Sequence, residues 1–345
     1  MKTRSLNQGW REFCFAVEYA LLLPLVKLIR RLPAKQAFLL GSWIAWALYS
    51  LLSRDRQWAY KNLQIVFGPT LSRVEQKRIV LASFENIVRT RIECIRWTKE
   101  WMFARVCEVG GQQSRQLRAE LDRDRRGLII LTVHLGNYEL LPAWCHFQGQ
   151  PSTVMYRPQD NWRVESLLLG SRQEYLPNVV ARSAVGLMSL NYLLRDGGNA
   201  GLLIDMNTLD DPVFVDFLGF LAASPPGPAA LALATDAFVL PMVSVRDPDG
   251  THRVISIHPV IETTRTGNRR RDIELNTARY MHVFEEYILA HPEQYNWPHP
   301  RWRLRPGGSF WKLDTPLAEI ERERVSTIRS LATTHRVEDR VARAA

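Results

Sequence analysis

From Gly127 onward, short apolar segments of strand length alternate with segments of helical periodicity. The apolar segments predict strands at Leu128–Val133, Thr153–Tyr156, Gly201–Ile204, Phe238–Val245 and Val254–Ile257. Helical patterns lie at Tyr138–Phe147, Trp162–Tyr175, Ala184–Arg195, Pro228–Asp236 and Asp272–Ala290. Because every strand and helix must bury an apolar face, this alternation favours a sheet covered by helices. We therefore predict an α/β fold with a mixed, mainly parallel sheet flanked by helices.

Two apolar runs precede this region. The first, Phe13–Val26, is interrupted by Glu18 and Pro24 and is not followed by a small-residue cleavage site. The second, Ala37–Leu52, contains no charge, but its helical length of roughly 24 Å is shorter than a hydrocarbon core of roughly 30 Å. Aromatic and basic residues in and after it suit a membrane interface: Trp43, Trp46, Tyr49, Arg54 and Arg56. We predict N-terminal membrane-associating helices, either as one short span or lying in the interface; the alternative is a helical hairpin buried in a core.

The texture of the sequence divides the chain into three parts. Residues 1–57 form the predicted membrane-associating helices. Residues 58–310 form the predicted α/β domain, which opens with amphipathic helices broken by turns at Gly68-Pro69 and Gly110-Gly111. Residues 311–345 are rich in charge and poor in bulky apolar side chains, so we expect a frayed helix or disorder there.

The charge balance points to an acidic partner. Lysine and arginine number 45 against 35 aspartates and glutamates, a net charge of +10. Nucleic acid is not expected, because the sequence has no zinc-finger spacing, RNP-like segment or recognition-helix signature. An anionic membrane or an acidic ligand remains. The four separated cysteines form no CxxC pair, which fits a reducing environment without disulfides or bound metal.

The most informative segment is Leu128–Glu139, where a predicted strand ends immediately before His134. Gly136 permits a tight turn, and Asn137 is a favourable N-cap for a helix that begins at Tyr138. This arrangement places an imidazole at the carboxyl edge of a sheet, where α/β proteins build ligand sites. The Gly136 turn can fold the Glu139 carboxylate back onto Nδ1 of His134.

A histidine paired with a carboxylate suits acyl transfer to an alcohol. Nε2 accepts the hydroxyl proton while the oxygen attacks a thioester, and the carboxylate fixes the tautomer of the ring. The acceptor hydroxyl is the nucleophile, so no enzyme serine is required. The plainer alternative is a helix-capping Glu139 beside a surface His134.

Six segments resemble, in the same order, the late acyltransferases of bacterial lipid A biosynthesis within the His-x4-Asp/Glu superfamily. These are Lys61-Asn62-Leu63, His134–Glu139 (HxGNWE), Met155–Pro158 (YRP), Asp205-Met206-Asn207 (DQN), Phe214–Gly219 (FVDFFG) and Pro292–Trp297 (PEQYxW), the last followed by His299 and Arg301. The likeness covers roughly residues 10–307. The sequence departs from it at Tyr138, at Met206 and at Ala223–Pro226, where a threonine-rich turn is common.

The resemblance implies transfer of a fatty acyl group from an acyl-carrier-protein thioester to a hydroxyl of a lipid A precursor. It implies the cytoplasmic face of the inner membrane and no metal or organic cofactor. It also implies that Arg157 stabilises the developing oxyanion or the acceptor phosphates, beside the catalytic His134 and Glu139. The plainer interpretation of Arg157 is a surface arginine that ends a strand.

We assign substrate binding to four further residues: Gly136, Asn137, Asp205 and Arg301. Asp205 ends a predicted strand and either holds the sugar of the acceptor, orders Arg157 or caps a helix. Three arginines alternate with two apolar residues over residues 301–305 (Arg301, Arg303 and Arg305 with Trp302 and Leu304), which predicts either a basic stripe near a phosphorylated lipid or an edge strand with one solvated face.

Rival functions remain open. The same residues suit an acyltransferase for another membrane lipid, such as a phosphoinositol mannoside, an ornithine lipid or a lysophospholipid. A non-catalytic lipid-binding protein of the same fold is the rival from another class. A hydrolase is disfavoured because no GxSxG motif occurs. Six further histidines show no metal-ligand spacing, so we expect solvated or satisfied core side chains: His146, His252, His258, His282, His291 and His299.

Overall fold

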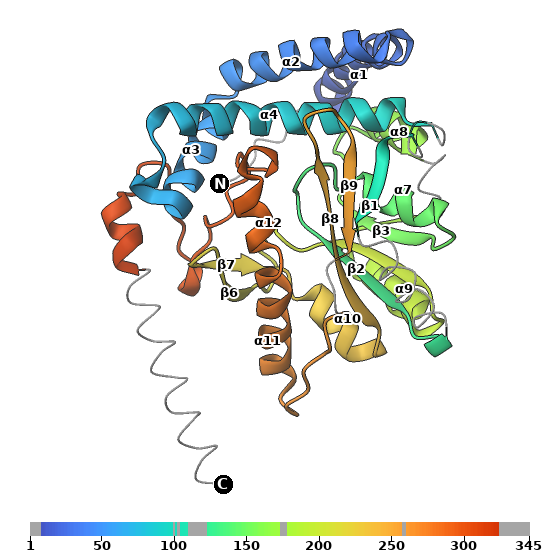
Figure 1. The fold of residues 1–345 in the computed structure, drawn as a ribbon, viewed down its shortest axis with the longest axis vertical. Helices are drawn as coiled ribbons and strands as arrows, with labels where there is room; N and C mark the ends of the chain where they lie inside the picture. Colours follow the sequence, from blue (N-terminus) through green and yellow to red (C-terminus); the bar gives the residue numbers. More distant parts are fainter. Residues whose placement is uncertain are drawn as a thin grey trace.

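The computed structural model describes residues 8–98, 101, 104–109, 123–172, 178–256 and 260–323. Within them, seven strands form one sheet in the order β1-β9-β8-β2-β5-β3-β4, and β6 and β7 form a separate hairpin (Figure 1). Neighbours in the large sheet are parallel except β8 and β9. The strands are β1 Val106–Val109, β2 Leu128–Thr132, β3 Ser152–Tyr156, β4 Val179–Ala181, β5 Asn199–Leu203, β6 Val213–Phe217, β7 Phe220–Ser224, β8 Phe238–Arg246 and β9 His252–Ser256. The predicted mixed, mainly parallel sheet is confirmed.

The centre of the sheet is β2, which pairs in parallel with β5 on one side and β8 on the other. Its register aligns Leu128 with Asn199 and Thr132 with Leu203. The residues that follow β2 and β5 therefore meet at the same edge of the sheet. Since β3 pairs in parallel with β5, its carboxyl end lies at this edge as well.

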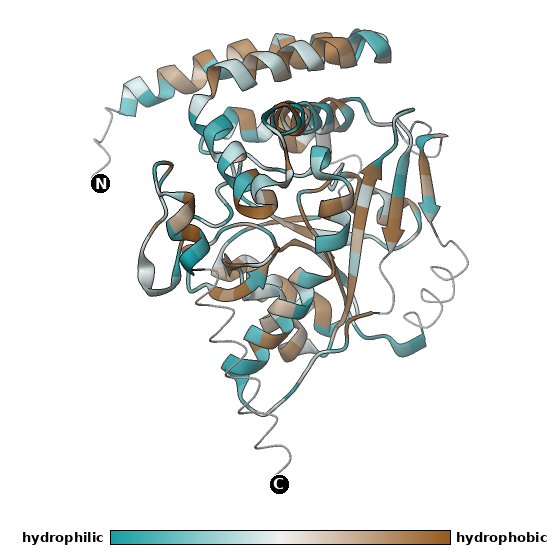
Figure 2. Cartoon of the chain, turned by 60° about the vertical axis from the view of Figure 1, so that its left-hand side comes forward, coloured by the Kyte–Doolittle hydropathy of each residue, from teal (hydrophilic) through white to brown (hydrophobic). Residues whose placement is uncertain are grey.

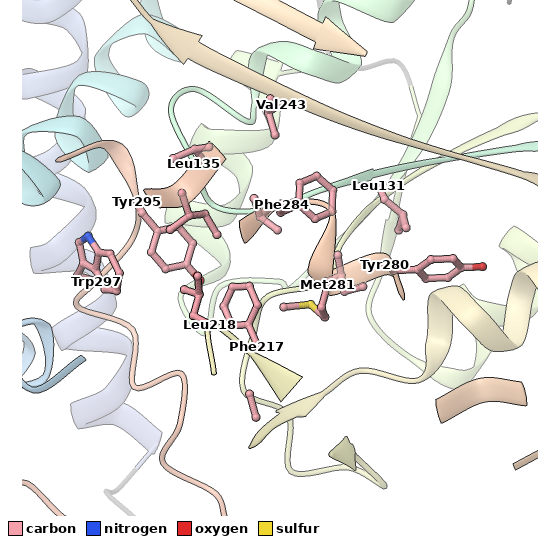
Figure 3. Close-up of a cluster of buried hydrophobic side chains, with 14 of the residues drawn as sticks. Leu131, Leu135, Phe217, Leu218, Val243, Tyr280, Met281, Phe284, Tyr295 and Trp297 are labelled. Atoms are coloured by element: carbon pink, nitrogen blue, oxygen red, sulfur yellow. The ribbon is translucent and has the colours of Figure 1, made fainter. Parts of the chain in front are cut away.

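Both faces of β2 are buried, which explains its unbroken run of apolar residues. Leu128 and Ile130 belong to one apolar cluster with Trp144 of α7 (Leu140–Phe147). Ile129 and Leu131 point to the other face, into the larger cluster. Figure 3 shows the part of that cluster where side chains from the β6–β7 hairpin, α11 and the 295–297 segment meet.

Helices cover the sheet on both faces. The helices after β2 are α7, α8 Trp162–Arg172, α9 Ala184–Arg195, α10 Gly227–Thr235, α11 Arg269–His282 and α12 Glu285–Ala290, with short 3-10 turns η2 Pro292–Gln294 and η3 Pro306–Gly308. The strands and helices predicted after Gly127 are present, with shifted ends. The helix predicted over Asp272–Ala290 is wrong as one element, because the structure divides it between α11 and α12.

Three strand pairings escaped the sequence analysis. β1 and β4 are short edge strands, and the β6–β7 hairpin turns through Leu218-Gly219. Both turn residues have positive φ, +53° and +81°, as a two-residue type I′ turn requires. The available signal was a Leu-Gly pair between two short apolar runs, Val213–Phe217 and Phe220–Ser224.

Four helices precede the sheet: α1 Gln8–Arg31, α2 Ala34–Leu51, α3 Ser53–Phe67 and α4 Arg73–Arg96. A short 3-10 turn, η1 Gly68–Thr70, begins at the predicted Gly68-Pro69 break. α4 begins at a capping box formed by Ser72 and Glu75. In Figure 1, α2 lies outside α4, along its length. The two helices approach so closely that a Cβ on Gly41 would lie 2.5 Å from Cδ1 of Ile92.

The beginning of the predicted charged tail packs on the domain. Trp311 and Ile320 are buried, and the Lys61 ammonium donates to the carbonyls of Lys312 and Thr315 at 2.7 Å each. Residues 324–345 and the predicted Gly110-Gly111 turn lie outside the described residues. The domain limits at 57 and 310 stay predictions.

Candidate active site

His134 and Asp205 meet at the carboxyl edge of the sheet. His134 follows β2 after one residue, and Asp205 follows β5 in the same way. Nδ1 of the imidazole lies 2.7 Å from Oδ1 of Asp205, and the backbone N–H of His134 donates to Oδ2 at 2.9 Å. One carboxylate therefore holds both the ring and the main chain of His134.

The surroundings of Asp205 decide which nitrogen carries the proton. Burial alone would raise the pKa of Asp205, but the charge and hydrogen bonds of His134, together with Arg301, lower that pKa to about 2. The carboxylate is therefore ionised at neutral pH and can only accept hydrogen bonds. Nδ1 of His134 must carry the proton, which leaves the Nε2 lone pair to act as a base. The imidazole is 15% exposed.

The expected contact between Glu139 and Nδ1 is wrong, because Asp205 occupies that position. Glu139 instead pairs with Arg91 of α4. Arg91 also donates to the Tyr138 hydroxyl at 3.3 Å, and the Tyr138 ring packs edge-on to His134 at 4.6 Å between centroids. Glu139 thus belongs to the surroundings of the imidazole through Arg91 and Tyr138. Its catalytic role stays a prediction.

Gly136 gives the loop after His134 its shape. Its φ is +58°, and a Cβ would lie 1.7 Å from the Ser244 carbonyl oxygen of β8. Its N–H donates to Gln294, and its carbonyl accepts hydrogen bonds from the side chains of Asn86 and Thr90. The predicted turn is therefore confirmed, and only glycine fits it.

The structure places both predicted substrate-binding residues of this loop in the interior, and their binding role stays a prediction. Gly136 is enclosed by β8 and α4, and Asn137 is fully buried, with its amide donating to Glu93 at 2.8 Å. Neither residue faces solvent. The predicted N-cap role of Asn137 is wrong, because α7 begins at Leu140 and Glu139 is its N-cap residue.

Arg301 is likewise an interior residue. It is 1% exposed, and its guanidinium donates to the Ala223 carbonyl and the Ser224 hydroxyl of β7. Arg305 is also buried and pairs with Glu323. The predicted basic stripe is therefore wrong, because Arg301 and Arg305 lie in the interior, and the substrate-binding assignment of Arg301 stays a prediction. The positive charge of Arg301 is one of the groups that lower the pKa of Asp205.

Arg157 directly follows β3 and is exposed at the same edge of the sheet as His134. β5 separates β3 from β2, so Arg157 lies two strands from His134, on the order of 10 Å away across the sheet. The loop that carries Arg157 is anchored to α1 by Asn161. The amide of Asn161 donates to the Phe15 carbonyl at 3.0 Å and to the Glu18 carboxylate at 2.8 Å.

His299 and Tyr295 complete the site, and the sequence analysis gave neither residue a role there. Nε2 of His299 accepts the N–H of Asn207 at 2.9 Å, which holds the loop after Asp205. Burial, and then the charge of His134, lower the pKa of His299 to about 4. Burial and Asp205 raise the pKa of Tyr295 well above its ordinary value. The signal was present, because both residues belong to the PEQYxW segment and its continuation.

α1 and α2 expose large apolar side chains, and Figure 2 shows long hydrophobic (brown) stretches along the N-terminal helical ribbon. The exposed side chains are Trp10, Phe13, Val17, Leu21 and Leu28 on α1, and Leu39, Trp43, Trp46 and Leu51 on α2. Four exposed basic residues lie at the corner between the helices: Lys27, Arg30, Arg31 and Lys35. Within the described ranges, no single helix is long and apolar enough to cross a membrane. The pair Ala34–Leu51 and Ser53–Thr70 qualifies only jointly, bent by 89°.

Comparison with known proteins identifies relatives along most of the chain. The sequence model of the bacterial lipid A biosynthesis acyltransferases matches residues 12–304. The chain is 26% identical over 289 residues to the lipid A biosynthesis lauroyltransferase of Escherichia coli K12, covering 81% of this chain and 90% of that protein. It is 26% identical over 282 residues to the lipid A biosynthesis acyltransferase of Haemophilus influenzae Rd, covering 81% and 84%. It is 25% identical over 285 residues to the E. coli K12 lipid A biosynthesis palmitoleoyltransferase, covering 81% and 88%.

Proposed function

Because the chain belongs to the bacterial lipid A biosynthesis acyltransferase family, we propose that this acyltransferase moves a fatty acyl group from an acyl-carrier-protein thioester to a hydroxyl of a lipid A precursor. The observation that carries the proposal is the 2.7 Å contact between Nδ1 of His134 and Asp205 at the carboxyl edge of the sheet. The relatives supply the reaction class, and this contact supplies the base.

The reaction proceeds by addition and elimination at the thioester carbonyl. Nε2 of His134 removes the proton of the acceptor hydroxyl as that oxygen bonds to the carbonyl carbon. Asp205 stabilises the imidazolium that forms, through the Nδ1–H hydrogen bond. The tetrahedral oxyanion then collapses, the carbon–sulfur bond breaks, and the imidazolium returns the proton to the departing thiolate. The products are an ester and a free thiol.

Two further residues act on the charges of this reaction. Arg157 is exposed at the same edge, and its guanidinium stabilises either the oxyanion or a phosphate of the acceptor. Glu139 holds Arg91 and, through it, Tyr138 against the imidazole. The net charge of +10 favours both an acidic carrier protein and a phosphorylated lipid.

Membrane attachment is the second part of the proposal. We place the protein on the cytoplasmic face of the inner membrane, with the exposed faces of α1 and α2 in the lipid interface. Trp43 and Trp46 suit the headgroup level, and the basic corner at residues 27–35 suits anionic lipid. Glu18 is compatible with this placement because it hydrogen-bonds to Asn161 of the protein.

The test is an assay of the purified protein with acyl-carrier-protein and acyl-coenzyme A thioesters and a panel of lipid acceptors. We expect transfer from the carrier protein to a lipid A precursor, and His134→Ala should lower it about 10³- to 10⁴-fold while vesicle binding persists. His282→Ala is the matched control, because that side chain is 81% exposed. Full activity of His134→Ala would refute the mechanism. Transfer to a lysophospholipid or ornithine lipid instead would refute the acceptor.

A further inference from the structure

A buried ionic cluster lies directly beneath the His134 loop, between α4 and the ends of β8 and β9. Its centre is Glu93, which is 1% exposed and lies on the inner face of α4. Arg246 ends β8 and approaches Glu93 at 2.7 Å, with its side chain 7% exposed. His252 begins β9 and lies 3.4 Å from the same carboxylate.

Arg246 donates to both oxygens of Glu93, and each oxygen also accepts a hydrogen bond from one further side chain. Oε1 accepts hydrogen bonds from Nε of Arg246 at 3.1 Å and from Nε of Arg89 at 3.3 Å. Oε2 accepts from Nη2 of Arg246 at 2.7 Å and from the Asn137 amide at 2.8 Å. Glu93 is therefore an ionised group shared between two arginines and one neutral side chain of the catalytic loop.

Ionisation of Glu93 follows from these neighbours. Burial by itself would raise the pKa of Glu93, but Arg246 and His252 lower it far below its ordinary value. The charged form is stabilised by donors that converge on it from three elements. Removing one partner of such a cluster is strongly destabilising, because the remaining charges stay buried.

Stability alone does not explain why the cluster is ionic. A buried ion pair often adds little stability compared with packed apolar side chains, so its value lies in geometry. The neutral partner of Glu93 is informative here. Oδ1 of Asn137 is buried and has no hydrogen-bond partner among the residues that the structure describes, so the Asn137 side chain is oriented by its amide contact with Glu93.

The same cluster reaches the loop by a second route. The backbone N–H of Arg246 donates to the Gln294 side chain at 2.8 Å, and Gln294 returns a hydrogen bond to the Arg246 carbonyl at 2.8 Å. The Gln294 carbonyl accepts the Gly136 N–H at 3.0 Å. Arg246 also donates to Asn86, whose amide bonds to the Gly136 carbonyl. Both routes end within three residues of His134.

We propose that Glu93 is a positioning residue for acyl transfer, which holds the His134 loop through Asn137 so that the imidazole stays aligned with Asp205. This inference rests on the proposed role of His134 as the base. Glu93 itself touches no substrate. A displacement of the base by about 1 Å can lower a rate about 100-fold, so the expected effect falls on kcat rather than on KM.

The test separates the loop contact from the ionic cluster. Asn137→Ser removes the amide and leaves Glu93 with Arg246, Arg89 and His252. Glu93→Gln removes the charge and keeps the shape. We expect each variant to lower kcat about 10- to 100-fold and to leave KM within about 3-fold. Asn137→Ser should melt lower because it loses a buried hydrogen bond to Glu93, and Glu93→Gln should melt lower still because it leaves buried arginines without their counter-charge.

Glu85→Gln is the matched control, because Glu85 lies on the same helix and is exposed. A combined variant with Glu93→Gln and Asn137→Asp places an amide donor opposite a carboxylate again. It should be more active than the product of the losses measured for Glu93→Gln alone and for Asn137→Asp alone predicts. If Glu93→Gln does not fold, Asn137→Ser decides by itself.

A value of kcat for Asn137→Ser within about 3-fold of the unmodified protein overturns the proposal. So does a fall in melting temperature with unchanged kcat in Glu93→Gln. Failure of the positioning role and failure of the proposed function give different results. If His134→Ala loses activity while Asn137→Ser stays active, only the positioning role is refuted. If His134→Ala stays active, the proposed function itself is refuted.

Discussion

The inner face of α4 buries polar side chains, including Asn86, Thr90 and Glu93, whereas the outer faces of α1 and α2 expose apolar ones, including Leu21 and Trp43. Each arrangement costs free energy in an isolated chain in water. Inside, the cost is offset by hydrogen bonds to the His134 loop, β8 and η2. Outside, no protein contact within the described residues covers the exposed rings, so the offset must come from elsewhere.

This comparison separates the two tasks of the molecule. The buried polar side chains hold the loop after His134 in one conformation, which requires directional contacts. The exposed apolar face suits attachment to lipid, which requires area rather than direction. α2 carries both kinds of surface. Ala37, Gly41 and Ala45 pack toward α4, while Trp43 and Trp46 face outward.

Among substitutions of the buried polar side chains, we expect the largest effect on kcat at Asp205. Asp205→Asn should lower kcat about 10³-fold, because the amide cannot hold the Nδ1–H tautomer as the carboxylate does. Glu139→Gln should lower kcat less, about 10- to 100-fold, because it releases Arg91 and Tyr138 but leaves Asp205 in place. Steady-state assays of both variants measure this difference. A larger loss of kcat in Glu139→Gln than in Asp205→Asn would mean that Glu139, rather than Asp205, is the carboxylate that orients the imidazole.

The next prediction concerns His299, a polar side chain near the site, and the pH dependence of the free energy of unfolding. The pKa of His299 is about 4 in the folded protein, below its ordinary value of 6.5, so the unfolded chain binds more protons between these values. Neutral His299 therefore contributes up to about 3 kcal/mol to the free energy of unfolding. This contribution is fully present above pH 6.5 and is lost as pH falls through 4.

His299→Gln should flatten this pH dependence, because an amide oxygen can accept the Asn207 N–H without titrating. Denaturant unfolding at pH 7 and pH 4 measures the difference for both proteins. An identical loss of stability in the two proteins would show that another group is responsible.

The role of the exposed apolar face is tested by replacing the tryptophan rings of α2. Trp43 is 70% exposed and Trp46 58%, so replacing both with serine should leave the melting temperature within about 2 °C. Binding to lipid vesicles should weaken about 10- to 50-fold, because two interfacial rings are lost. Vesicle cosedimentation measures binding. Unchanged binding together with a large fall in melting temperature would mean that the rings serve folding.

The smallest expected effect concerns the basic corner. Lys27→Gln should weaken binding to anionic vesicles about 5-fold and leave binding to neutral vesicles unchanged, since one surface charge contributes about 1 kcal/mol near such a membrane. Raising the salt concentration should reduce the difference between the two proteins. Equal weakening on neutral vesicles would contradict an electrostatic role.

Local patterns in the sequence were sufficient for much of the fold. The unbroken apolar run at Leu128–Thr132 predicts a strand buried on both faces, and Gly136 predicts the turn that its positive φ confirms. The place of His134 at a strand end follows from the same pattern. Helix ends were less predictable, because Asn137 is drawn into the interior by Glu93 and α7 begins three residues later.

What the sequence by itself determined is therefore most of the strands and helices after Gly127, the place of His134 at a strand end and the apolar N-terminal runs, since these depend on residues close together in the chain. Only the tertiary structure decided that Asp205 rather than Glu139 meets Nδ1, that Arg301 is buried, and that Glu93 lies beneath the loop. These contacts depend on the parallel register of β2 with β5 and on the packing of α4. Such pairings join residues far apart in the chain, and local periodicity carries no information about them.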